Sequence, residues 1–332
     1  MARDLAKLSE LLALRTRAWP LGHWYWGDAI AVDGLLAVSH VDPGSIRGHV
    51  LEQLRRWLRS VPTGYHDALA PGAAIARLVA DGELPGAATE RFLRALDHLP
   101  SLYGSVPALE PHLSPYRFGL CIDAVYHLPP ALAAIGVGRA DQRLLTRAVT
   151  VAVEMLDTLR CPGGWAHWYD VGRGRNNAVP WSRGVGWALL GALDTLGFAR
   201  GRVNADRLRE LAMEMLTTMG AWQQESGHWG SVLGRDDLPP ESSVAAFFVA
   251  AQLHPETTWP TDSRLVAAAQ DALLSSIAAD GTYRGVSADV LPDWNPLSYE
   301  RFEVEPSPWG QGVALRALGA MMAAEALQRT GA

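Results

Sequence analysis

A loose internal repeat constrains the fold of this chain more than any other feature of its sequence. Six times, a loop rich in glycine, proline, serine or aromatic residues leads into a segment of mostly small apolar residues. These loop-and-helix units cover residues 22–40, 64–80, 115–136, 181–197, 241–253 and 308–327. A helix that is apolar almost all round is typical of a buried position. The repeat therefore predicts six inner helices.

The segments between these units have a different pattern, with apolar residues at three- and four-residue spacing opposite Arg, Glu and Gln. They cover residues 45–60, 89–98, 141–159, 205–222 and 262–278, and the N-terminal twenty residues also alternate charges with leucines. Such one-sided helices cover buried ones. Alternating strand patterns are nearly absent. We therefore predict an all-α fold, an (α/α)6 barrel or six-hairpin toroid, as a single catalytic domain over residues 1–332.

Composition and charge exclude several kinds of partner. The chain has 332 residues, 48% of them hydrophobic, which is enough for a large core. A net charge of −6 gives no basis for binding nucleic acid or an anionic membrane. Charges interrupt the N-terminal segment, and no apolar stretch reaches the ~20 residues of a membrane span. We expect a cytoplasmic monomer or homodimer, in which nothing requires Cys121 and Cys161 to form a disulfide.

The sequence contains no signature of a metal or cofactor. Its histidines are scattered, without a close pair at ligand spacing beside acidic residues. The glycine-rich segment after Asp170 does not follow a strand-to-helix pattern, so we do not interpret it as a phosphate loop. We therefore expect neither a metal ion nor a cofactor.

Tryptophan is frequent, and many of the 13 tryptophans lie in or near the loops before inner helices. These are Trp24, Trp26, Trp165, Trp168, Trp181, Trp187, Trp229, Trp294 and Trp309. In a toroid these loops meet at one rim, where binding residues are commonly found. Aromatic faces pack against the C–H faces of sugar rings, and the indole N–H donates a hydrogen bond. This favours a carbohydrate or other cyclic ligand; the alternative is that the rings only fill the barrel mouth.

Two aspartates are the candidate catalytic residues. Asp123 lies in the apolar run of the third inner helix, where an acid is costly to bury unless it is paired or protonated. Burial and a second carboxylate nearby would suit it to general acid catalysis. Its mid-helix position argues against a capping role. Asp67 follows His66 and precedes the start of an inner helix at Pro71, so N-capping is the alternative for Asp67.

Further polar residues stand near the same loops. His167 and Arg183 bracket a polar loop; a histidine exchanges protons, and an arginine offers a rigid fork for a carboxylate. A structural ion pair is the alternative for Arg183. Glu241 begins an inner helix, where it would either contact a ligand or stabilise the helix dipole. Asp28 and Asp33 are five residues apart, so they do not share one helix face.

Several segments resemble, in the same order, those of the unsaturated glucuronyl and unsaturated rhamnogalacturonyl hydrolases, glycoside hydrolase families 88 and 105. They are YHDALAPG, FGLCIDAVYHLPPALAAIG, GWAHWYD with PWSRGVGWALLGALD, and GHWGSVLGRDDLPPESSVAAFFVAAQL. The resemblance implies a six-hairpin barrel without a metal, with Asp123 and Asp67 as catalytic residues. It also implies a substrate-binding set of His167, Arg183, Trp181, Trp187, Trp229 and Glu241, to which we add the loop residues Trp26 and His66.

The reaction implied by the resemblance is removal of a Δ4,5-unsaturated uronic acid from the non-reducing end of a lyase-generated oligosaccharide. It begins with hydration of the vinyl ether, in which Asp123 protonates C4 and activates the water that attacks C5. The sequence departs from the family after Pro71-Gly72, where Ala73 and Ala74 replace a basic residue, and after Asp123 itself. An acid–base isomerase, dehydratase or cyclase acting on a secondary metabolite is therefore the first alternative, and a non-catalytic carbohydrate-binding protein the second.

Overall fold

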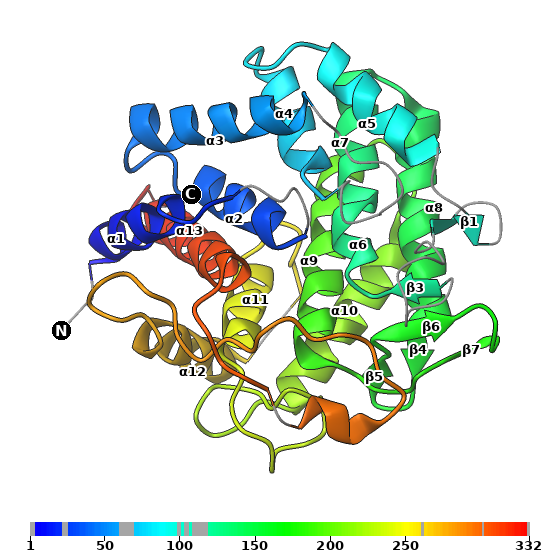
Figure 1. Cartoon of the computed structure of the whole chain (residues 1–332), viewed down its shortest axis with the longest axis vertical. Helices are drawn as coiled ribbons and strands as arrows, with labels where there is room; N and C mark the ends of the chain where they lie inside the picture. Colours follow the sequence, from blue (N-terminus) through cyan, green and yellow to red (C-terminus); the bar gives the residue numbers. More distant parts are fainter. Residues whose placement is uncertain are drawn as a thin grey trace.

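The computed structural model of the chain describes residues 4–21, 26–59, 70–97, 101–102, 106–107, 119–259, 262–300 and 302–330. Most of this part of the chain is helical, and the helices are arranged in a ring (Figure 1). None of these described helices combines the length and the apolar character needed to cross a bilayer.

Six inner positions alternate along the chain with outer helices. The inner helices are α2 (Trp26–Ala37), α4 (Gly72–Ala80), α6 (Ala124–His127) with α7 (Pro129–Gly138), α9 (Ser182–Ala199), α11 (Ser242–Gln252) and α13 (Pro308–Thr330). Almost every residue of α9 and α11 is buried. The outer helices are α1 (Leu5–Arg17), α3 (Pro43–Trp57), α5 (Ala87–Asp97), α8 (Gln142–Leu159), α10 (Asp206–Ala221) and α12 (Ser263–Ser275). The predicted (α/α)6 barrel is confirmed.

The ring closes where the first and last inner helices cross. α2 and α13 pack along each other over much of their lengths, and α1 covers α13 from outside. Gly34 and Gly312 lie at this crossing; a Cβ on Gly34 would overlap the carbonyl oxygen of Gly312, and one on Gly312 that of Ile30. Only glycine therefore allows the two backbones to approach this closely.

The third inner helix differs from the prediction of one continuous helix. Pro129 and Pro130 cannot donate backbone hydrogen bonds, and the chain breaks at Leu128 between α6 and α7. The segment before α6 forms a short strand, β3 (Gly119–Cys121). Asp123 consequently stands at the N-cap position of α6 and not inside a helix, which corrects the position expected from the sequence.

Short antiparallel strands lie in the loops between the helices. β3 pairs with β6 (Trp168–Asp170), which pairs with β7 (Arg175–Asn176). Two further pairs are β1 (Ser101–Leu102) with β2 (Val106–Pro107), and β4 (Arg160–Cys161) with β5 (Gly164–Trp165). A 3₁₀ helix, η2 (Pro296–Tyr299), lies in the loop before α13.

A buried polar network joins the inner helices. Arg316 of α13 donates to both carboxylate oxygens of Asp194 of α9, at 2.9 and 3.0 Å, and to the hydroxyl of Tyr126 at 3.1 Å. The Tyr126 hydroxyl in turn donates to Asp33 of α2. Burial alone would raise the pKa of Asp194, but Arg316 and its other cationic neighbours hold this pKa well below its usual range. Asp33 is thus a structural residue of the barrel interior.

Candidate active site

Asp123 lies at the rim, held by the turn from β3 into α6. Its backbone is helical (φ −62°, ψ −25°), and its side chain makes no cap hydrogen bond although it stands at the N-cap. The side chain is only 8% exposed. The capping role weighed against catalysis is therefore absent, even though the predicted mid-helix position was wrong.

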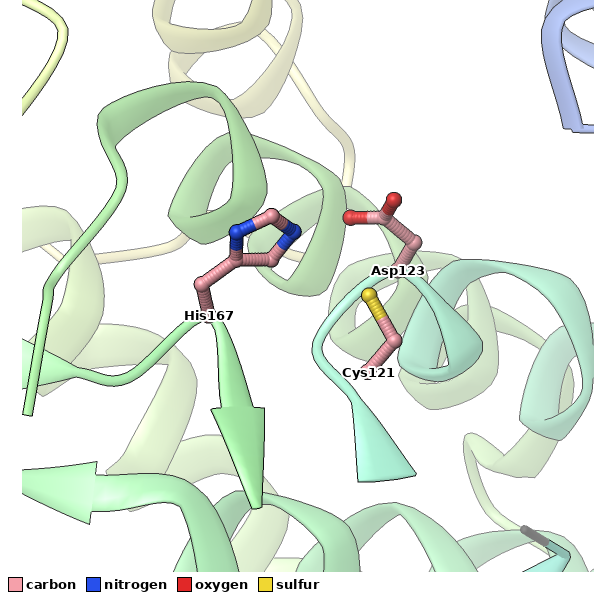
Figure 2. Close-up of side chains that lie close together, drawn as sticks. All are labelled: Cys121, Asp123 and His167. Carbon is pink, nitrogen blue, oxygen red and sulfur yellow. The ribbon is translucent and has the colours of Figure 1, made fainter. Parts of the chain in front are cut away.

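The pairing of β3 with β6 brings His167 next to Asp123. Cys121 lies opposite Trp168 in the register, and Ile122 N donates to His167 O at 3.0 Å. Figure 2 shows Cys121, Asp123 and His167 facing one another, with one polar or sulfur atom of each residue within 4.8 Å of the others. The structure thus joins two residues predicted for the site, Asp123 and His167, and adds Cys121.

His167 is a neutral imidazole in this position. Its side chain is buried against the ring of Trp181, with 4.3 Å between the ring centroids. Burial, and then the charge of Arg183, lower the pKa of His167 from 6.5 to about 3. The ring therefore carries no net charge at neutral pH.

The hydrogen bonds around Tyr299 fix the tautomer of this imidazole. Its hydroxyl oxygen accepts from Asn177 Nδ2 at 3.1 Å and from Asp293 N at 3.0 Å, and it lies 2.8 Å from His167 Nδ1. Since a hydroxyl has two lone pairs and one proton, the proton of Tyr299 goes to Nδ1. His167 then carries its own proton on Nε2, the nitrogen that faces Asp123 in Figure 2.

Tyr299 was not among the residues predicted for the site. It lies in η2, 132 residues from His167, and its segment has no spacing or motif that points to the active site. Burial raises the pKa of Tyr299 well above its usual range, so the hydroxyl keeps its proton. Only the tertiary fold brings it to His167.

Arg183 forms one wall of the site and holds a neighbouring loop. It is completely buried; Nη1 donates to the Ser287 carbonyl oxygen at 2.6 Å and hydroxyl at 2.8 Å, while Nη2 donates to Ala288 O at 2.8 Å. Its guanidinium lies 4.8 Å from the centre of the Trp181 ring. Its Nε has no hydrogen-bond partner among the described residues. Both terminal nitrogens of the Arg183 guanidinium therefore donate hydrogen bonds within the protein.

Glu241 also binds the loop at Ser287. Its Oε1 accepts from Ser287 N at 3.0 Å and lies 3.9 Å from Arg183 Nη1, while Oε2 accepts from the Ser243 hydroxyl at 2.6 Å. The carboxylate is almost fully buried at the start of α11. This geometry gives Glu241 a structural role beside its predicted role in binding.

Three aromatic rings surround Arg183. Trp26 lies 4.7 Å from Trp309 and edge-on to Trp187 at 5.9 Å, measured between ring centroids. Arg183 lies about 6 Å from the rings of Trp26 and Trp309. Trp309 was recognised among the loop tryptophans but not assigned to the site. The structure thus gathers Trp26, Trp181 and Trp309 around one buried cation, and Trp187 packs against Trp26.

Trp229 does not join this cluster. Its Nε1 donates to Met219 O of α10 at 2.7 Å, and its ring lies 4.9 Å from that of Phe248 in α11. The side chain is fully buried between these helices. The substrate contact expected for Trp229 is therefore corrected to core packing. Asp67 and His66 lie outside the described residues, so their roles stay predictions.

Cys121, Asp123 and His167 form the group in the described part of the chain that could hold a metal ion. Thiolate, carboxylate and imidazole are all zinc ligands, and scattered sequence positions gave no sign of this grouping. Two features of the site oppose a cation. The proton on Nε2 of His167 occupies the lone pair that would bind it, and the guanidinium of Arg183 interacts with Asp123 as a nearby positive charge. The arrangement suits proton transfer better than metal binding.

Comparisons with known proteins agree with this fold. The family model of Glycosyl Hydrolase Family 88 matches residues 113–324, which include Asp123, His167 and Arg183. A possible member of the GH105 family from Salmonella enterica has 16% sequence identity and a TM-score of 0.86, covering 98% of this chain and 95% of that chain.

Two further solved structures are similar. The family 105 glycoside hydrolase of C. acetobutylicum has 16% identity and a TM-score of 0.82, with 97% of this chain and 100% of that chain covered. The unsaturated glucuronyl hydrolase of Bacillus sp. GL1 has 18% identity and a TM-score of 0.69, with 94% of each chain covered. A sequence comparison with curated proteins gives no match.

Proposed function

The chain belongs to Glycosyl Hydrolase Family 88, and on that premise we propose that it removes a Δ4,5-unsaturated uronic acid from the non-reducing end of an oligosaccharide. The observation that carries this proposal is the position of Asp123. It is a buried carboxyl group beside a neutral imidazole whose Nε2–H faces it. Such a pair can pass one proton to a substrate and take one back.

The proposed reaction balances with one water molecule. The Asp123 carboxyl transfers its proton to C4 of the vinyl ether, and a water oxygen adds to C5 while its proton passes to the Asp123 carboxylate. The product is a hemiketal at C5. Its ring C5–O bond then breaks to give a ketone, and the hemiacetal left at C1 releases the aglycone as an alcohol and becomes an aldehyde. Asp123 ends in the protonated form in which it began.

The surrounding residues would orient the sugar and stabilise charge. His167 would donate from Nε2 to the Asp123 carboxylate or to a substrate oxygen, since Tyr299 holds the imidazole in that tautomer. The ring of Trp26 would pack against the sugar, and the fully buried Trp187, edge-on to it at 5.9 Å, would support that ring from behind. Arg183, held by the loop at Ser287, would contact ring or carboxylate oxygens of the unsaturated uronic acid.

The remaining predicted residues complete the proposal. Asp67 would orient the substrate or share the proton with Asp123, and His66 would contact the sugar.

We also retain the proposals of a cytoplasmic location and of a monomeric or homodimeric state. Light scattering of the purified chain would give the oligomeric state directly.

An ultraviolet assay tests the proposed activity. Purified protein is mixed with lyase-generated unsaturated disaccharides, and the vinyl-ether absorbance is followed. Asp123→Asn should lose the activity, whereas Cys121→Ser, a small change in the same cluster, should keep it because Cys121 has no step in the reaction. An active Asp123→Asn enzyme would remove this residue from its assigned role. No absorbance loss with glucuronyl and rhamnogalacturonyl substrates would favour the isomerase, dehydratase or cyclase alternative.

A further inference from the structure

The helical turn that carries Asp123 has little support from its own backbone. α6 is four residues long and ends just before Pro129 and Pro130, which cannot donate backbone hydrogen bonds. Within the turn, the carbonyl oxygen of Asp123 accepts from Tyr126 N at 2.9 Å and from His127 N at 3.2 Å. A single helical turn is unstable by itself, because helix nucleation is unfavourable. Tertiary contacts therefore hold the Asp123 turn in place.

One set of these contacts is with α9. A Cβ on Gly191 would overlap the carbonyl oxygen of Val125, and one on Gly184 would overlap the side chain of Ile122. The two glycines are seven residues apart, which places them on one face of α9. The backbone on both sides of Asp123 thus packs directly on this helix.

The side chain of Tyr126 makes a second set of contacts. It is buried, and its ring packs against Trp187 of α9 with 4.8 Å between the ring centroids. The hydroxyl donates to Asp33 of α2 and accepts from Arg316 Nη1 of α13 at 3.1 Å. The Asp123 turn is therefore bonded to the two helices that close the ring.

The hydrogen bonds beyond Tyr126 continue across the barrel interior. Arg316 donates to both carboxylate oxygens of Asp194, whose Oδ1 also lies 3.3 Å from His254 Nε2 and 3.8 Å from Arg77 Nη2. Each inner position, or the turn that ends its helix, thus contributes one polar side chain to this network: Asp33, Arg77, Tyr126, Asp194, His254 and Arg316. Tyr126 is the member on α6, three residues from Asp123.

We propose that Tyr126 is a positioning residue for the reaction, which fixes the Asp123 carboxyl group by anchoring α6 to α2 and α13. The inference rests on the proposed function, because that function makes Asp123 the proton donor. A reacting group must lie about 3–3.5 Å from its target atom, and a displacement of about 1 Å costs up to about a hundredfold in rate. Without the hydroxyl contacts, Tyr126 would keep only its ring packing, and Asp123 would occupy a wider range of positions.

The test compares kcat for variants at the two ends of the bond between Tyr126 and Asp33. Tyr126→Phe keeps the ring and removes the hydroxyl, so kcat on an unsaturated disaccharide should fall about tenfold or more with little change in KM. Asp33→Ala should also lower kcat. Asp33→Asn should restore most of that loss, because its amide oxygen accepts the bond from the hydroxyl.

His254→Ala is the matched control. It removes a partner of Asp194 from the same network but leaves both bonds of the Tyr126 hydroxyl in place. It should lower the free energy of unfolding and leave kcat unchanged at a temperature at which every variant is folded. Wild-type kcat in Tyr126→Phe, or an equal loss of kcat in His254→Ala, would overturn the inference.

Hydrogen exchange separates this inference from the proposed function, because it needs no substrate. The amide hydrogens of Tyr126 and His127, which bond to Asp123 O, are followed by mass spectrometry in a peptide that covers residues 122–128. Their exchange should be severalfold faster in Asp33→Ala, which leaves the sequence of this peptide intact, and unchanged in His254→Ala. This result would support the anchoring by Tyr126 even if no unsaturated substrate is hydrolysed. Turnover of unsaturated disaccharides, with wild-type exchange and kcat in Asp33→Ala and Tyr126→Phe, would retain the proposed function and refute the anchoring.

Discussion

Replacement of His167 by asparagine should change how the stability of the protein depends on pH. In the folded protein the pKa of this imidazole is lowered to about 3, by burial first and then by Arg183, whereas the ordinary value is 6.5. Below pH 6.5 the unfolded chain therefore binds a proton at this residue that the folded chain does not. Stability contributed by the neutral imidazole is present in full above pH 6.5 and is lost as the pH falls towards 3.

The magnitude follows from the size of the shift. Each pH unit below 6.5 should cost about 1.4 kcal/mol of unfolding free energy, so about 2 kcal/mol is lost between pH 6.5 and about pH 5. Asparagine does not titrate, and its Oδ1 takes the place of Nδ1 as acceptor for the Tyr299 hydroxyl. The variant should therefore lose less stability over this range.

Urea unfolding at several pH values between about 7 and 5 measures this effect. Other histidines titrate in both proteins, including His228, whose pKa burial also lowers, so their contribution cancels in the difference. The free energy of unfolding of the wild type should fall more steeply than that of His167→Asn. Parallel curves for the two proteins would refute the claim that His167 is buried as a neutral ring.

Three further changes test other parts of the structure. Tyr299→Phe removes the hydroxyl that orients His167, so kcat on an unsaturated disaccharide should fall about tenfold or more with little change in KM. A change in KM alone would show that Tyr299 does not position His167 for the reaction. Asp194→Ala removes the carboxylate partner of the buried Arg316 guanidinium and should destabilise the fold by about 3–5 kcal/mol in urea unfolding; an unchanged free energy of unfolding would contradict the role given to this ion pair. Gly312→Ala should lower the free energy of unfolding by about 1–3 kcal/mol and Tm by several degrees, because the new Cβ overlaps the carbonyl oxygen of Ile30. An unchanged Tm would contradict the close crossing of α2 and α13.

The barrel could be predicted from the sequence because its signal is local and repeated. The inner helices are mostly apolar and the outer helices are apolar on one face, and this contrast recurs in each helical hairpin. The break at Leu128 was missed, although Pro129 and Pro130 mark it, because the flanking residues are uniformly apolar. Strands of two or three residues, such as β3, are too short to show an alternating pattern.

The candidate site was only partly predictable. The Asp123 and His167 motifs identify residues that the fold brings together through the pairing of β3 with β6. Tyr299 joins them by a tertiary contact, and Cys121 through the same strand pairing, and no local pattern marks either residue. Trp229 belongs to an aromatic-rich loop like the others, and only its hydrogen bond to α10 separates packing from binding.

The roles of buried charges could not be read from residue type. Arg183 and Glu241 both fit a substrate-binding motif, yet each is committed to the loop at Ser287. A buried charge must be paired or hydrogen-bonded wherever it lies. The same residue types therefore occur whether the charge binds a ligand or supports a loop that does, and the partners decide between the two.

The central claim is that Asp123 delivers a proton to C4 of an unsaturated uronic acid, and proton NMR of the reaction in D₂O tests it most directly. The account predicts that the vinyl C4–H signal disappears, that one solvent deuteron appears at C4 of the released keto acid, and that Asp123→Asn leaves the substrate unchanged. Release of a sugar that keeps its vinyl signal would show attack at the anomeric carbon and would contradict the account.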